Sequence, residues 1–195
     1  MTTFFTSDTH FGCDKLIHNT RPRFSCMLEH DVALLDGINR KVGRNDQLVI
    51  LGDFCKEKPG LYRPCINCKN IFFILGNHDK EVKIRAVFGG NVWQHRIVKV
   101  GADRVWCSHY PTAYWDRSHY GVYHAYGHLH FNHEREAAMN LGFPGRRSMD
   151  VGADAAHHHL GDYVPFSWEE MKEILASAKG HDIIDKKDRW QQRDF

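Results

Sequence analysis

Five short blocks of the sequence carry side chains that can bind metal ions. The first is Asp8-Thr9-His10, in which two such side chains lie two residues apart. Alternate residues of an extended chain project to the same side, so both can reach one ion while Thr9 points away. The block His128-Leu129-His130 repeats this spacing with two imidazoles. Each of these blocks can therefore supply a pair of ligands.

Three further blocks lie between these two and bring the oxygen and nitrogen donors to seven. They are Gly52-Asp53, Gly76-Asn77-His78-Asp79 and Ser108-His109-Tyr110. Seven donors exceed what one tetrahedral ion takes, but they suit two ions that share a bridging carboxylate. Such a pair keeps coordination positions for water and substrate. The spacing therefore predicts a site with two metal ions.

Each block comes directly after a short apolar run that predicts a buried β-strand. The runs are rich in Phe, Val and Ile and are bounded by Gly or polar residues. With their polar ends they span residues 3–8, 48–53, 71–79, 105–109 and 122–130. In open α/β sheets, ligands bind in the crevice beyond the carboxyl ends of the strands. We therefore expect the five blocks to converge in space.

Two helices are predicted around these strands. Between the first two strands, apolar residues at steps of three and four define one face of a helix. These residues are Leu28, Val32, Leu35, Ile38 and Val42. A capping box at Ser167-Trp168-Glu169-Glu170 starts the second helix, and Gly180 ends it.

The composition and the far C-terminal segment define the domain organisation. With 42% apolar and 26% charged residues among 195, the chain has the composition of one compact soluble domain. Residues 181–195 are mostly charged and lack clear periodicity. We predict a single domain over residues 1–180, followed by a charged tail or peripheral helix over 181–195.

The composition also argues against several classes of protein. The longest uninterrupted apolar run, 71–75, is far shorter than the roughly 18 residues of a membrane span, so no membrane partner is expected. A formal net charge of +2 argues against a nuclease on long nucleic acid. No secretory signal is visible, and the six cysteines are expected to stay reduced. These features predict a cytoplasmic protein.

The order of the five blocks resembles the calcineurin-like metallophosphoesterases. The pattern of that family runs D-x-H, G-D, G-N-H-D/E, H and G-H-x-H, and all five parts are present over residues 4 to about 154. The small bacterial and phage phosphoesterases are the most similar, because a block like Ser108-His109-Tyr110-Pro111 is followed there by one like Arg117-Ser118-His119. The resemblance implies a single-domain α/β fold in which two packed β-sheets are flanked by helices.

The same resemblance implies a role for each candidate residue. The resemblance implies two sets of three ligands. The first ion would be bound by Asp8, His10 and His130, and the second by Asn77, His109 and His128. Asp53 would bridge the two ions. His78 would be catalytic, because in the family it lies over the leaving-group side of the phosphate, where an imidazole can stabilise charge or donate a proton.

The reaction that the resemblance implies is hydrolysis of a phosphate ester. Two divalent ions would lower the pKa of a shared water, and the resulting bridging hydroxide would attack phosphorus in line. Nitrogen and oxygen ligands without thiolate suit Mn, Fe, Zn or Ni, and the family favours Mn. The blocks leave no room for a capping domain, so we expect an open cleft. An open cleft favours a phosphodiesterase on small or nucleotide-like substrates over a phosphomonoesterase.

Variation within the family suggests two alternatives. Protein Ser/Thr phosphatases carry an Asp three positions after the bridging Asp, where it orients the catalytic histidine, and this chain has Lys56 there. A protein phosphatase is therefore less favoured, and Asp79 beside His78 is a candidate for the orienting group. The other alternative is a non-catalytic interaction scaffold like the retromer subunit of the family, in which the catalytic histidine is replaced. The presence of His78 favours an enzyme.

Other residues with metal-binding or phosphate-binding side chains stay outside the predicted site. His157-His158-His159 is expected in a surface loop, since three consecutive residues of a regular element cannot all face one ion. Cys65-x-x-Cys68 lacks the second pair of ligands that a structural zinc needs. Guanidinium groups match phosphate oxygens, but solvated surface is the simpler expectation for Arg21, Arg117, Arg146 and Arg147.

Overall fold

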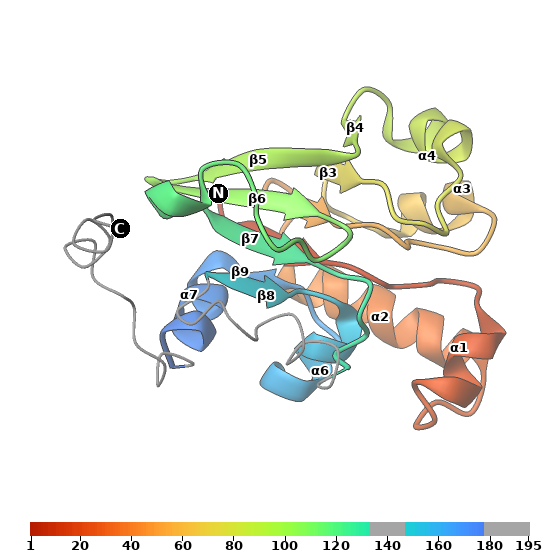
Figure 1. Cartoon of the computed structure of the whole chain (residues 1–195). Coiled ribbons are helices and arrows are strands. Elements are labelled where there is room, and N and C mark those ends of the chain that lie inside the picture. Colours follow the sequence, from red (N-terminus) through yellow and green to blue (C-terminus); the bar gives the residue numbers. More distant parts are fainter. Residues whose placement is uncertain (133–146, 178–195) are drawn as a thin grey trace, which may run out of the picture.

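The computed structural model describes residues 1–132 and 147–177, which form two β-sheets with helices outside them (Figure 1). The first sheet has five strands in the order β4-β3-β2-β1-β9. These strands are β1 (Thr3–Thr6), β2 (Gln47–Ile50), β3 (Asn70–Ile74), β4 (Val92–Trp93) and β9 (Phe166–Ser167). Strands β1 to β4 pair in parallel, and β9 is antiparallel to β1.

The second sheet has four strands in the order β5-β6-β7-β8. These strands are β5 (His95–Val100), β6 (Asp103–Ser108), β7 (Tyr123–Tyr126) and β8 (Ser148–Asp150). Strands β5 and β6 form an antiparallel hairpin, whereas β6, β7 and β8 pair in parallel. The five predicted strands are confirmed as β1, β2, β3, β6 and β7.

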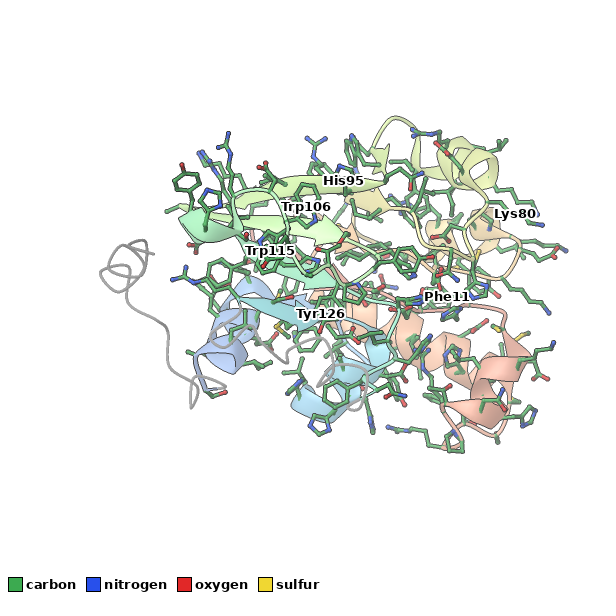
Figure 2. All side chains as sticks on the ribbon, viewed as in Figure 1. Phe11, Lys80, His95, Trp106, Trp115 and Tyr126 are labelled. Atoms are coloured by element: carbon green, nitrogen blue, oxygen red, sulfur yellow. The ribbon has the colours of Figure 1, made fainter. Side chains whose placement is uncertain are left out.

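Two apolar layers hold the sheets in place. Because successive residues of a strand point to opposite faces, Phe4 and Phe5 of β1 enter different layers. Phe4 packs in the layer that includes Leu34 of helix α2 (Met27–Lys41). Phe5 packs in the layer between the sheets, together with Val105 of β6. Side chains fill the space between the ribbons (Figure 2), so the strand ends of the two sheets are held in a fixed relation.

Short helices complete the fold. Besides α2 they are α1 (Asp14–Asn19), α3 (Pro59–Tyr62), α4 (Glu81–Phe88), α6 (Ala153–Leu160) and α7 (Trp168–Ser177), with 3-10 turns η1 (Arg63–Cys65) and η2 (Ser118–Tyr120). In Figure 1, α3 and α4 lie together beside β4, at the opposite side of the molecule from α7. Within the described residues, every helix is too short or too polar to cross a bilayer.

The capping box predicted at the start of α7 is confirmed. The Ser167 N–H donates to Glu170 Oε2 at 2.8 Å, and the Glu170 N–H donates to Ser167 Oγ at 3.2 Å. These two bonds satisfy backbone donors that the first turn of a helix leaves open. The predicted end at Gly180 and the predicted tail over 181–195 lie outside the described residues.

The apolar face predicted for α2 is only partly the buried face. Ile38 and Val42 are buried, but Leu28 and Val32 are 70% and 56% exposed. The buried residues of α2 are His30, Asp31, Leu34, Gly37 and Ile38. Apolar periodicity missed this stripe because two of its members have polar side chains that hydrogen-bond inside the protein.

This orientation of α2 predicts different effects for two leucines on one helix. Leu34→Ala should lower the free energy of unfolding by about 2–5 kcal/mol, because the side chain is buried in the core. Leu28→Ala, the matched control, should change it by about 0.5 kcal/mol or less. Urea denaturation followed by circular dichroism measures both. Equal losses would contradict the observed orientation.

Candidate metal centre

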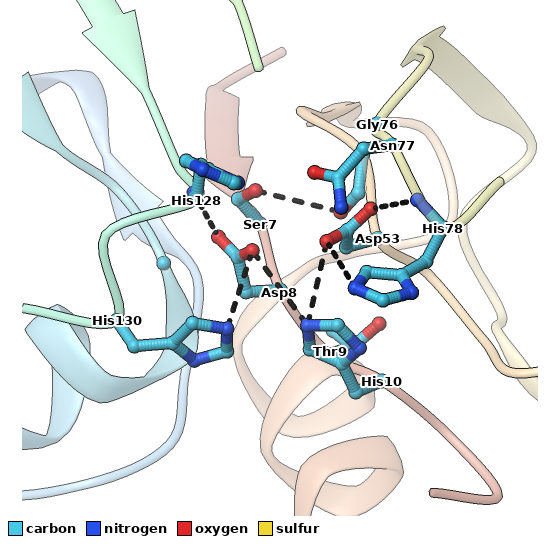
Figure 3. Close-up of polar contacts among 12 residues, drawn as sticks. Ser7, Asp8, Thr9, His10, Asp53, Gly76, Asn77, His78, His128 and His130 are labelled. Carbon is cyan, nitrogen blue, oxygen red and sulfur yellow. Dashed lines mark hydrogen bonds and ion pairs between the residues drawn. The ribbon is translucent and has the colours of Figure 1, made fainter. Parts of the chain in front are cut away.

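The five polar blocks meet at one edge of the molecule, where parallel strands of both sheets end. The blocks follow β1, β2 and β3 of the first sheet and β6 and β7 of the second. Figure 3 shows side chains from these blocks pointing to a common centre, among them Asp8, Asp53 and His130. The convergence that the sequence predicts is therefore observed.

Two groups of side chains at this edge could each hold a metal ion. Within each group the potential ligand atoms lie within 4.8 Å of one another, and the groups are Asp8, His10 and His130, and Asp53, His109 and His128. Asn77 adjoins the second group, because its Oδ1 lies 2.9 Å from His109 Nε2. All seven candidate ligands are thus near one or both groups, and among residues 1–132 and 147–177 these are the two clusters of this kind.

The Asp53 carboxylate lies between the two groups. Its Oδ2 is 3.5 Å from His10 Nε2 of the first group and 3.5 Å from His109 Nε2 of the second. Its Oδ1 accepts a hydrogen bond from the His78 backbone N–H at 2.8 Å. A carboxylate held in this position can contact an ion in each group, as a bridging ligand does.

Two buried atoms of the first group show that its residues fit a cation. Asp8 Oδ1 and His10 Nε2 are buried and have no hydrogen-bond partner among the described residues. Asp8 Oδ1 lies 3.8 Å from both His10 Nε2 and His130 Nε2. A buried polar atom without a partner costs about 1–3 kcal/mol. Oxygen and nitrogen donors without thiolate are suitable ligands for a divalent ion, which would satisfy both atoms.

Five of the candidate ligands have left-handed backbone conformations, which residues other than glycine rarely adopt. Their φ angles are 54° at Asp8, 46° at His10, 50° at Asp53, 72° at His128 and 51° at His130. Such conformations cost roughly 1–3 kcal/mol each and cluster at functional sites, where surrounding contacts maintain them. The concentration of strain at these residues supports a functional role for this edge.

The left-handed residues also correct a prediction about how the first block reaches the site. Asp8 and His10 were expected to point the same way because the chain is extended, and this reason is wrong. Backbone hydrogen bonds hold the turned conformation, since the N–H groups of Asp8 and His10 donate to the carbonyls of Gly52 and Asp53 at 3.0 and 2.9 Å. Thr9 does point away, because its hydroxyl donates to Phe54 O.

Two glycines of the blocks allow the strand ends to approach each other. Gly52 has a φ of 91°, and a Cβ added there would lie 2.5 Å from Gly76 N. A Cβ added at Gly127 would collide with the side chains of Ser7 and Asp8. Because only glycine fits these positions, the G of the G-D and G-H-x-H blocks is a packing requirement of the site.

Burial and neighbouring charges set the protonation states of three candidate ligands before an ion binds. Burial lowers the pKa of His10 to about 3, so this imidazole is neutral near pH 7. Burial would raise the pKa of Asp53, but the hydrogen bond and charge of His109 lower it to about 2. Burial would lower the pKa of His109, but Asp53 and Asp8 outweigh this effect and raise it to about 9. His109 must therefore release a proton when an ion binds.

Hydrogen bonds from outside the site orient two of the imidazoles. His109 Nδ1 donates to Leu51 O at 2.7 Å, and His130 Nδ1 donates to Asp154 Oδ2 at 2.8 Å. Each ring then presents Nε2 to the site, the arrangement commonly found for metal-ligating histidines. Asp154 is not among the site residues that the sequence predicts. Its position in the sequence resembles that of the other blocks, because Asp154 follows a short strand, β8, and Gly152.

Asp79 braces the backbone of the site and does not orient His78. Its Oδ2 accepts hydrogen bonds from the N–H groups of Asp53 and Gly76 at 2.8 and 2.9 Å. Its Oδ1 accepts from the Phe54 N–H at 3.2 Å. Both oxygens are thus engaged by the backbone, and the hypothesis that Asp79 acts on the imidazole is not supported. Asp79 instead joins the blocks that follow β2 and β3.

His78 lies on the solvent-exposed side of the site, and its ring lies beside Asp53 and His10 in Figure 3. Its side chain is 62% exposed, and its Nε2 is 4.0 Å from Asp53 Oδ2. The ring meets the His10 ring edge to face, with centroids 5.3 Å apart. His78 belongs to neither group of potential ligands. This placement leaves the imidazole accessible to a molecule that enters the site.

Three motifs that the sequence analysis left outside the site have different outcomes. His157-His158-His159 lies in helix α6, so the prediction of a surface loop is wrong. Cys65 is exposed and Cys68 is buried, and within the described residues neither joins a group of three potential ligands. Arg21 is fully buried, so the expectation of solvated surface is wrong for this residue.

The fold and the two ligand groups define the class of protein. The family model described as calcineurin-like phosphoesterase matches residues 1–184, and the chain belongs to this family. The resemblance and the α/β fold predicted from the sequence are therefore confirmed. The family comprises metal-dependent phosphoesterases, in agreement with two groups of residues that could hold divalent ions.

The chain is also similar to solved structures, one of them over most of its length. A protein of unknown function from Aquifex aeolicus is 22% identical, with a TM-score of 0.68 over 89% of this chain and 98% of that one. YfcE, a phosphoesterase from E. coli, is 19% identical with a TM-score of 0.38, over 67% of this chain and 70% of its own. A predicted phosphoesterase from Streptococcus pneumoniae is 17% identical with a TM-score of 0.37, over 66% and 62%. No curated protein sequence matches the chain.

Proposed function

We propose that this protein is a phosphodiesterase that acts on small or nucleotide-like phosphate esters with two bound divalent metal ions. The observation that carries the proposal is the Asp53 carboxylate, which lies 3.5 Å from an imidazole of each ligand group. A carboxylate shared between two groups of nitrogen and oxygen donors is the arrangement of two-metal hydrolytic sites.

The proposal assigns each ligand to an ion. Each ion would be held by three residues, with Asp53 shared between the two ions. The ligands of the first ion would be Asp8, His10 and His130, and those of the second would be Asn77, His109 and His128. When bound, such ions stabilise charge on phosphoryl oxygens and lower the pKa of water. We propose Mn as the native metal, although Fe, Zn and Ni also suit these donors.

His78 is proposed to act on the leaving group. Its ring is 62% exposed and is outside both ligand groups, so it remains available when both ions are bound. Its backbone N–H is fixed to Asp53, which anchors the residue beside the reacting phosphate. In this position the imidazole can hold a proton on Nε2 and transfer it to the leaving oxygen, as a general acid does near neutral pH.

A hollow beside the first ligand group supports a nucleotide-like substrate. It has a volume of about 450 Å³ and is lined by Thr20, His130, Phe131, Asp154, His157, His158 and Tyr163. The rings of His157 and Tyr163 stack with centroids 4.6 Å apart and form one wall. A hollow of this size beside the metal centre can take an ester substituent such as a nucleoside. Monoesters and diesters both carry such a substituent, so our preference for a diester rests on the open cleft that the sequence predicts.

We also propose a cellular location and the limits of the catalytic domain. All six cysteines have free thiols, which supports a cytoplasmic location, where thiols stay reduced. We propose that residues 1–180 form the catalytic domain.

A substrate screen tests the proposed function. Protein reconstituted with Mn, Fe, Zn or Ni is assayed with bis(p-nitrophenyl) phosphate, p-nitrophenyl phosphate and cyclic nucleotides. We expect the highest kcat/KM on a diester with Mn. Turnover of the monoester alone would make the protein a phosphomonoesterase. Metal binding without any turnover would identify a non-catalytic interaction scaffold.

A further inference from the structure

A buried arginine connects the three residues of the first ligand group to one another. Arg21 lies in the segment after α1, has an exposure of 0%, and is one of the largest fully buried side chains. A guanidinium group is rarely fully buried unless it is paired. Its partners are therefore informative about what the burial achieves.

All five N–H donors of Arg21 have acceptors in the protein. Nε and Nη2 donate to the two carboxylate oxygens of Asp154 at 2.8 and 2.9 Å, a bidentate pair. Nη2 also donates to Asp8 O at 2.7 Å, and Nη1 donates to Thr9 O at 3.3 Å. Nη1 further lies 2.8 Å from His30 Nε2. One side chain thus binds the segment after β1 and the start of α6.

The His30 contact shows that the position of Arg21 is itself fixed. Because arginine can only donate, His30 Nε2 must accept, and His30 Nδ1 is then the donor to Asp31 Oδ1 at 2.8 Å. Asp31 in turn accepts hydrogen bonds from the Gly12 N–H at 3.0 Å and the Tyr62 hydroxyl at 2.9 Å. The guanidinium is therefore held from behind by a continuous buried chain of polar groups.

Apart from the His30 contact, each hydrogen bond of Arg21 leads to a ligand of the first group, and none of them reaches the second group. Asp8 is bound through its own carbonyl, and His10 is bound through the carbonyl of the preceding Thr9. His130 is bound through Asp154, whose Oδ2 accepts from His130 Nδ1 at 2.8 Å. Asp154 therefore accepts hydrogen bonds from both Arg21 and His130.

We propose that Arg21 and Asp154 are positioning residues for the first metal ion. Asp154 fixes the tautomer and direction of His130, and Arg21 sets the distance between Asp154 and the strained Asp8-Thr9-His10 turn. Neither residue belongs to a group of potential ligands. This inference rests on the proposed function, because it requires the two ions of that proposal.

The test is metal binding by the Arg21→Lys variant. Lysine keeps the positive charge, but a single ammonium cannot bridge two carboxylate oxygens and two carbonyls in the same geometry. Titration calorimetry with Mn²⁺ should show that the affinity for one ion is reduced by about tenfold to a hundredfold, while the affinity for the other ion is unchanged. A reduction of this size is the usual effect of losing a hydrogen-bond partner of a metal ligand. Anomalous scattering from Mn²⁺ in crystals of the variant should locate the weakened ion beside His130.

Arg23→Lys is the matched control. Arg23 lies two positions away, is exposed, and places its guanidinium 5.3 Å from the Tyr163 ring, whereas Arg21 lies 5.6 Å from the same ring. Of these two arginines, Arg21 is the one that hydrogen-bonds to Asp154. Arg23→Lys should bind both ions as the wild type does.

Asp154→Asn provides a second variant in case Arg21→Lys fails to fold. The amide keeps the size of the side chain but loses the charge that pairs with Arg21, and the same selective loss of the first ion is expected. The positioning role alone would be overturned if both variants kept two ions at wild-type affinity. It would also be overturned if both variants lost the two ions equally, together with thermal stability. A wild-type protein that binds fewer than two ions would overturn the proposed function and this inference with it.

Discussion

Asp53→Asn is expected to reduce the phosphoesterase activity by about a thousandfold or more, because several kcal/mol of metal-dependent stabilisation are lost. The substitution preserves the size of the side chain and can preserve the acceptor for the His78 N–H. It removes the negative charge that lies 3.5 Å from an imidazole of each ligand group. Both ions are therefore weakened at once. Activity at saturating metal and bound metal after gel filtration measure the effect.

Two controls separate this effect from general damage. Asp36→Asn removes a carboxylate from the surface of α2, where its side chain is 67% exposed, and should leave activity unchanged. Cys65→Ser should also leave activity nearly intact, because Cys65 is exposed and outside both ligand groups. If Cys65→Ser and Asp53→Asn lost equal activity, a cysteine-based metal site would have to be considered again. Full activity and two bound ions in Asp53→Asn would exclude the bridging role.

The positions of the candidate ligands could be predicted because each follows a strand that the sequence marks clearly. A run such as 71–75 is apolar and ends in Gly76-Asn77-His78, so the strand and its polar end are both visible in the sequence. Parallel strands bring such ends to one edge of a sheet. The convergence of blocks far apart in sequence then follows without knowledge of any side-chain contact.

The backbone conformation of the ligands could not be predicted in the same way. Asp8 adopts a φ of 54° because its N–H bonds the Gly52 carbonyl, 44 residues away. Local propensity favours an extended chain there, and the tertiary contact overrides it. The two-residue strands β4 and β9 were missed for a related reason, since two residues are too few to show periodicity.

Arg21 shows why residues around the ligands escape sequence reasoning. Arg21 stands beside Pro22 and Arg23, and a short segment with this composition is typically solvated. Its burial depends on Asp154, 133 positions further along the chain, and on His30, which occupies a polar position in the buried stripe of α2. Neither partner has a local signal that points to Arg21. Paired buried charges are therefore found only when the fold is known.

His78→Ala is expected to lower kcat by about a hundredfold to ten thousandfold while the metal content stays unchanged. The imidazole is 62% exposed and belongs to neither ligand group, so its loss should not release an ion. A general acid matters most when the leaving oxygen is basic. The variant should therefore lose less activity on a diester with a good leaving group, such as p-nitrophenol, than on one with a poor leaving group, such as an alkyl alcohol.

His18→Ala is the matched control for this prediction, because His18 on α1 is similarly exposed, at 72%, and lies outside the site. It should retain wild-type kcat on both substrates. The ratio of the losses on the two substrates distinguishes the two roles of His78, because a residue that only positions the substrate would reduce both rates by the same factor. Equal losses would therefore make His78 a positioning group, and loss of bound metal would make it a ligand. Either outcome would contradict the proton-donor role, whereas a larger loss on the alkyl leaving group with both ions retained would support it.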